Sequence, residues 1–127
     1  PVAHWTHNHH FGSALADKGL YREAEPYLRQ SADLLARPEV QATRKFGSMA
    51  RSLASLGKLE WHAGRHAEAE KRFRQAVGYD RKVAAKERSA ERLGLLVRFL
   101  LSQGRTADAR PALDEYLKVP GLTATGG

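Results

Sequence analysis

The sequence predicts an all-α protein built from three tandem helix-turn-helix hairpins. Its composition favours helices, because it contains 20 Ala and 16 Leu but no Ile and only 6 Val. An internal repeat supports three hairpins, since the same residue types recur at the same distances from Gly19, Gly64 and Gly104. Each of these glycines follows one stretch with helical spacing of apolar residues and precedes another.

The first helix of each hairpin is expected to end at its glycine. Mostly apolar residues stand four, seven, eight and eleven positions before it, which places them along one stripe of a helix. Eight positions before the three glycines stand Phe11, Leu56 and Leu96. A glycine suits the helix end because it adopts backbone conformations that other residues avoid.

The second helix of each hairpin should begin within a few residues of the glycine. An acidic residue four positions after the glycine suits the positive end of the helix dipole. A small alanine follows at five positions and lets the two helices approach closely, while a larger apolar residue at nine positions fills the space beside it. The residues at these offsets are Glu23, Glu68 and Asp108, then Ala24, Ala69 and Ala109, and finally Leu28, Phe73 and Leu113.

This pattern resembles the tetratricopeptide repeat, in which two packed helices form each unit. The glycines lie 45 and 40 residues apart, and such stretched units resemble the kinesin-light-chain type, whose bacterial relatives often contain a segment like 23–28. The resemblance implies hairpins stacked as a right-handed α-α superhelix. It departs from the family at Glu60, where an aromatic residue or Leu is usual, and at Ser31 and Tyr116, where Ala is usual. The residues that carry it are Gly12, Leu15, Gly19, Tyr21, Ala24 and Leu28 in the first unit, Leu56, Gly57, Gly64, Ala69, Phe73 and Ala76 in the second, and Leu96, Leu100, Gly104 and Ala109 in the third.

We expect a single domain over residues 1–118, with units of about 5–37, 40–80 and 81–118, followed by a flexible tail or linker over 119–127. The uncharged, turn-forming tail and the absence of an initial methionine suggest a piece of a longer protein. No apolar run approaches the roughly 18 residues that a membrane-spanning helix needs. We expect a cytoplasmic location.

The resemblance implies a protein-protein interaction module, a scaffold whose first helices line a concave groove for a partner peptide or a neighbouring domain. Counted from the glycines, the exposed positions of these helices make the groove mildly basic, with Trp61 as an aromatic anchor. Long cations around an aromatic side chain suit an acidic peptide that carries one apolar residue. Alternatively, Trp61 simply covers the turn and the cations are solvated. The candidate groove residues are His9, Ser13, Arg51, Lys58, Trp61, His62, Arg98 and Leu101.

Two other functions are compatible with the sequence. Residues 37–98 carry 15 Lys and Arg against 7 Asp and Glu, and a basic helical surface of this kind can bind nucleic acid through its phosphates. Few aromatic residues are placed to stack on bases, however. The chain could also be a regulatory domain of a larger enzyme. The third unit lacks a polar capping helix, which predicts continued packing or association with another copy of the chain.

We expect no catalysis, no cofactor and no metal site. The sequence has no cysteine, no glycine-rich phosphate loop and no nucleophile motif. His4, His7 and His10 share a helix face, but no nearby carboxylate completes a set of metal ligands. The sequence is also unlike the repeat units that clamp a chaperone's C-terminal carboxylate. The positions where those units use Lys, Asn and Arg hold His9, Ser13, Ser55, Glu91 and Leu95 here.

Overall fold

A computed structural model describes residues 2–84 and 87–119, and over these residues the chain contains helices and no strand. The expected all-helical fold is thus confirmed. The part of the sequence expected to form a tail lies, from residue 120 onward, outside the described residues. The helices are α1 (Val2–Asp17), α2 (Tyr21–Leu34), α3 (Pro38–Gln41), α4 (Phe46–His62), α5 (His66–Asp80), α6 (Glu91–Ser102) and α7 (Thr106–Leu117).

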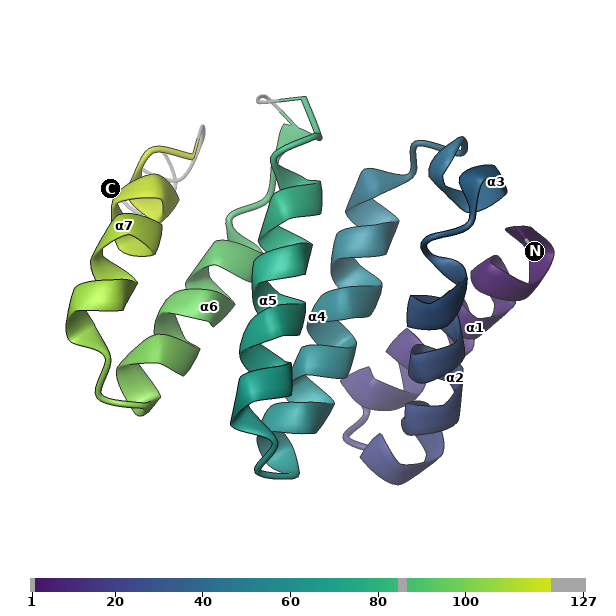
Figure 1. The fold of residues 1–127 in the computed structure, drawn as a ribbon, viewed down its shortest axis with the longest axis horizontal. Helices are drawn as coiled ribbons and strands as arrows, with labels where there is room; N and C mark the ends of the chain where they lie inside the picture. The colour runs from purple at the N-terminus through teal and green to yellow at the C-terminus, as the bar shows by residue number, and fades with distance from the viewer. Residues whose placement is uncertain (1, 85–86, 120–127) are drawn as a thin grey trace.

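The six long helices form three hairpins that stand side by side along the length of the molecule (Figure 1). The first helices, α1, α4 and α6, form one layer, and the second helices, α2, α5 and α7, form the other (Figure 1). Successive hairpins meet where α2 packs on α4 and where α5 packs on α6. The short α3 lies in the joint between the first two hairpins and accounts for part of their wider spacing. The described residues therefore form a helical-repeat solenoid.

Each of the three glycines ends the first helix of its hairpin, as the sequence predicts. Gly19, Gly64 and Gly104 have φ angles of 78°, 81° and 71°, which lie in the left-handed region. The amide of Leu20 then donates a 2.9 Å hydrogen bond back to the carbonyl of Leu15, and the equivalent bond closes the other two turns. The glycines thus allow the chain to reverse while the last carbonyls of the helix stay bonded.

Close approach between the two helices of a hairpin depends on a second set of small residues. A Cβ atom added to Gly12 would lie 2.8 Å from the side chain of Leu28, and one added to Gly57 would lie 2.6 Å from the Phe73 ring. Both partners are fully buried. The helices are therefore packed at a distance that only glycine permits at these two positions.

Ion pairs connect the hairpins to one another at repeated positions. Arg65, one residue after the second glycine, donates to Glu25 of the first hairpin at 3.3 Å. Arg105, one residue after the third glycine, pairs in the same way with Glu70 of the second hairpin. Both acids stand six positions after the glycine of their own hairpin. We call these two contacts the rim pairs, because they join the outer layer of second helices.

The family departure at Glu60 has a structural explanation. This side chain is almost fully buried in the interface between the first two hairpins. One carboxylate oxygen lies 3.7 Å from the guanidinium of Arg29, and the other lies 3.4 Å from that of Arg72. A buried charge is tolerated when opposite charges accompany it, and here one arginine comes from each hairpin.

Candidate functional site

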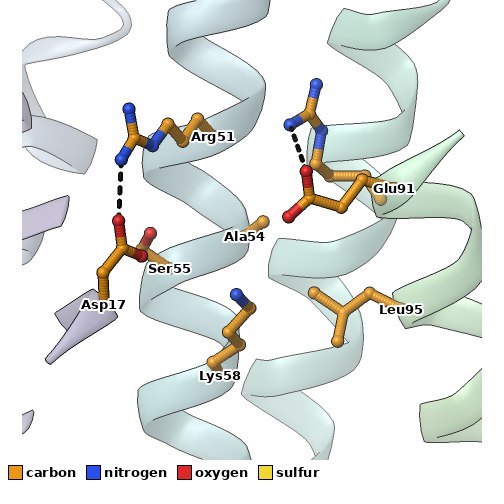
Figure 2. A pocket seen from close by; sticks show the side chains of 8 residues that line it. Asp17, Arg51, Ala54, Ser55, Lys58, Glu91 and Leu95 are labelled. Carbon is orange, nitrogen blue, oxygen red and sulfur yellow. Dashed lines mark hydrogen bonds and ion pairs between the residues drawn. The ribbon is translucent and has the colours of Figure 1, made fainter. Parts of the chain in front are cut away.

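A hollow of about 300 Å³ opens on the layer of first helices, between α4 and its neighbours (Figure 2). We call it the central hollow. Side chains from all three hairpins line it, so that it exists only when the hairpins are stacked. Its lining residues are Asp17, Arg51, Ala54, Ser55, Lys58, Glu91, Arg92 and Leu95.

Most charges around the central hollow are already paired. Arg51 donates to Asp17 at 2.7 Å. Arg92 makes two 2.8 Å hydrogen bonds to Asp80, which raise the pKa of Arg92, and its guanidinium also lies 3.8 Å from Glu91. The lining therefore contains acidic as well as basic side chains.

Lys58 is the exception in this lining. Its ammonium group extends into the space between α4 and α6, where Ala54 and Leu95 provide apolar surface (Figure 2). It makes no ion pair with any residue that the structure describes. A half-buried lysine whose ammonium group extends into an open hollow can bind an anionic group of another molecule.

Of the eight residues proposed from sequence, Arg51 and Lys58 line the central hollow. Trp61 lies elsewhere, half-buried in the core, with its ring perpendicular to that of Phe99 at 5.2 Å and to that of Phe73 at 6.0 Å. The tryptophan thus packs between the second and third hairpins.

His9 and Ser13 are both buried, because α4 packs over them. Burial, together with the nearby positive groups of His10, Arg51 and Lys45, lowers the pKa of His9 to about 4. These two residues therefore lie within the interface between hairpins and do not line the central hollow.

The other three candidates lie apart from the central hollow. His62 is exposed beside Tyr21, with the ring centroids 4.8 Å apart, in a separate depression near the turns. Arg98 lines a hollow on the far side of α6, and Leu101 is half-exposed near the end of that helix.

Sequence reasoning omitted Ser55, Arg92 and Leu95 from the exposed face of the first helices. All three stand nine or twelve positions before their glycine, whereas the candidates included positions two and three residues before it. The hollow is lined by the end of α1, the middle of α4 and the start of α6, so no single offset from the glycine describes its lining.

No group of three or more His, Asp or Glu within residues 2–84 and 87–119 is arranged to hold a metal ion. His4 and His7 lie with Asp33 along a different hollow, between α1 and α2. Nor does any helix in the described part of the chain have the length and apolarity to cross a membrane.

Many cations of the basic stretch 37–98 are engaged within the molecule. Arg74 pairs with Glu70 at 2.9 Å, and Arg81 pairs with Glu115 at 2.8 Å. Arg44 and Lys82 form no ion pair with described residues and lie over the face of the Phe46 ring, each 5.3 Å from its centroid, beside a hollow of about 500 Å³. One group of cations without ion pairs to described residues thus lies around the start of α4.

Comparison with known proteins identifies one match. Residues 49–78, which span most of α4 and α5, match the family described as Tetratricopeptide repeat. No curated protein and no solved structure matches the chain. The matched segment covers most of the second hairpin, which contributes four of the eight residues that line the central hollow.

Proposed function

Because the chain is a helical-repeat array whose second hairpin is a tetratricopeptide repeat, we propose that it is a non-catalytic scaffold that binds a partner protein along its first helices. The partner is a peptide segment or a neighbouring domain, and it contacts α1, α4 and α6 together. A cytoplasmic location and self-association through the third hairpin belong to the same proposal. The central hollow supports this function because all three hairpins contribute to it.

Lys58 carries the proposal and gives the partner its chemistry. Its ammonium lacks an ion pair within the described chain, while Arg51 and Arg92 beside it have carboxylate partners. One acidic side chain of the partner would complete this position, and an adjacent apolar side chain would contact Leu95. The partner therefore needs one acidic side chain, which accepts a charge-assisted hydrogen bond from Lys58, and it need not be acidic along its whole length.

A peptide library displayed on phage and selected against the immobilised chain tests this proposal. The selected sequences should contain an acidic residue next to an apolar one. Their binding should weaken roughly tenfold or more in Lys58→Glu, which replaces attraction at the central hollow with repulsion. The matched control is Lys71→Glu, an exposed lysine on α5 in the opposite layer, and it should leave peptide affinity within about twofold.

Two results would contradict the proposal. One is a selection that yields only basic or purely apolar peptides. The other is equal loss of binding in both lysine variants, which would show that overall charge, and not the central hollow, determines affinity.

Nucleic-acid binding is the second candidate, and the cations at the start of α4 favour it. Arg44, Lys45 and Lys82 form no ion pair with described residues and surround one hollow. The faces of Phe46 and Tyr79 are occupied by these cations, which leaves little surface for base stacking. Retention of single-stranded RNA that falls steeply between about 50 and 200 mM salt, with no peptide selected, would favour this candidate over ours.

A further inference from the structure

The first hairpin leaves an apolar position open that the other two hairpins cover. Eight positions before the glycine, Leu56 is 1% exposed, in a cluster with Ala24 and Leu28 of the preceding hairpin, and Leu96 is 3% exposed within the larger core cluster. Phe11 stands at the same position of the first hairpin and is 53% exposed. Within the described chain, nothing plays the part of a preceding helix for Phe11. We call this surface of α1 the leading face.

The third hairpin leaves the complementary position open. Nine positions after the glycine, Leu28 and Phe73 are both fully buried between the first helix of their own hairpin and that of the next: they approach Gly12 and Gly57, and they also meet Leu56 and Phe99. Leu113 stands at this position in the third hairpin and is 37% exposed, with the more exposed Leu117 one turn further along α7. A hollow of about 380 Å³ lies beside Leu113, with Val97 in its lining. We call this surface the trailing face.

The contacts inside the chain show what fits each face. Leu56 packs into a cluster with Ala24 and Leu28, which stand five and nine positions after the first glycine. In the third hairpin these two positions hold Ala109, which is already buried, and Leu113, which is 37% exposed, so that Leu113 is the exposed member of the same small-then-large pair. The leading face presents an apolar knob, and the trailing face presents the place where such a knob packs elsewhere in the molecule.

From this match we propose that the chain associates head to tail, with the leading face of one copy packed on the trailing face of another. Phe11 of one copy packs on Leu113 of the next, in the place that Leu56 occupies beside Leu28 within the chain. The new interface continues the repeat that already joins the hairpins. Phe11, Leu113 and Leu117 do not line the central hollow, so their substitution tests association separately from peptide binding.

The rim pairs distinguish a second copy from an additional hairpin like the second or third. In the third hairpin the acidic position is occupied by Arg110. A following hairpin with an arginine like Arg65 or Arg105 would place like charges together, which opposes packing. The first hairpin holds Leu20 at that position and brings no such repulsion. The chain's own leading face therefore suits its trailing face better than a copy of its later hairpins would.

This interface is heterologous, because its two sides are different surfaces, and it does not close on itself. Each added copy leaves one leading face and one trailing face free. We therefore expect the mean mass of the particles to rise steadily with concentration and to pass that of a dimer.

Sedimentation equilibrium of the chain from about 10 µM to about 1 mM tests the proposal, together with two end-blocking variants. Phe11→Asp and Leu113→Asp each place a charge on one face, and each variant alone should remain monomeric at all concentrations. An equal mixture should form dimers and no larger species, since each kind of variant supplies the one intact face that the other lacks. Ala67→Asp, at an exposed position of α5, is the control and should associate like the unchanged chain.

The mixture separates this arrangement from a symmetric dimer. If two trailing faces paired with each other, Phe11→Asp alone would dimerise and the mixture would gain nothing. That result, or an unchanged chain that stays monomeric at the highest concentration, overturns the proposal. Circular dichroism monitors helicity, and Leu117→Asp on the same face replaces Leu113→Asp if the latter unfolds.

Leu20 provides a test of register. Leu20→Glu would place an acid opposite Arg110 of the adjoining copy and should strengthen association severalfold, whereas Leu20→Arg should weaken it by a similar factor. Equal affinities for the two variants would show that copies do not meet in the register of the internal hairpins.

Discussion

Gly57 offers the most direct test of how the hairpins pack. The Cβ of an alanine at this position would lie 2.6 Å from Cε1 and 2.8 Å from Cδ1 of Phe73. Carbon atoms ordinarily approach to about 3.5–4.0 Å, so Gly57→Ala creates an overlap of about 1 Å. Phe73 cannot swing aside, because it is fully buried and packs edge-on against Trp61 and Phe99.

Two opposing effects set the size of the change. Overpacking of a tight core costs about 1–3 kcal/mol, while replacing a helical glycine by alanine contributes about 0.8–1 kcal/mol of helix propensity. With the Phe73 ring held in place, the cost of overpacking should be near the top of its range. We expect Gly57→Ala to lower the free energy of unfolding by about 1–2 kcal/mol.

Gly78→Ala is the matched control, since the added Cβ would meet no atom within 4 Å and the residue also lies within a helix. It should raise the free energy of unfolding by about 0.5–1 kcal/mol through helix propensity alone. Urea unfolding followed by circular dichroism measures both variants. The reasoning fails if the two substitutions change stability in the same direction, because the contact with Phe73 would then carry no cost.

Two further predictions concern buried ionisable groups. Glu60→Leu should leave the free energy of unfolding unchanged or raise it by up to about 2 kcal/mol, because Arg29 and Arg72 can turn to water. Arg72→Ala should lower it by roughly 2 kcal/mol, because it removes a partner of the buried carboxylate. A large loss of stability in Glu60→Leu would contradict this. His9 has a pKa of about 4 in the folded chain, so it binds its proton less readily there than in the unfolded chain. The free energy of unfolding should therefore fall by about 1–3 kcal/mol as the pH drops from about 6.5 to 4. Urea titrations should find a smaller fall in His9→Gln, and an equal fall in both proteins would contradict the role of His9.

The hairpins could be predicted from sequence because each depends on local chemistry. A glycine at a helix end and an acid in the next first turn are visible at fixed offsets, and the structure confirms both, while the alanines expected at the close approach are buried. The order and pairing of the helices follow directly. Even the departure at Glu60 was visible as an anomaly, although its two arginine partners were not.

The candidate site was harder to predict because its charges are neutralised by residues distant in sequence. Arg51 looks like a free cation until Asp17 of the preceding hairpin is placed beside it. Trp61 looks like an exposed anchor until Phe99 of the next hairpin packs against it. Spacing along one helix gives the direction of a side chain, but the partner across the interface depends on the angle and register between hairpins.

The rim pairs make part of the contact between hairpins sensitive to salt. Buried apolar contacts join successive hairpins where α2 packs on α4 and where α5 packs on α6, while Glu25–Arg65 and Glu70–Arg105 add partly exposed charges between the second helices. Exposed ion pairs weaken as ionic strength rises, whereas apolar contacts do not. Added salt should therefore loosen the rim while the apolar interfaces stay closed, so that the angle between neighbouring hairpins depends on the ionic medium.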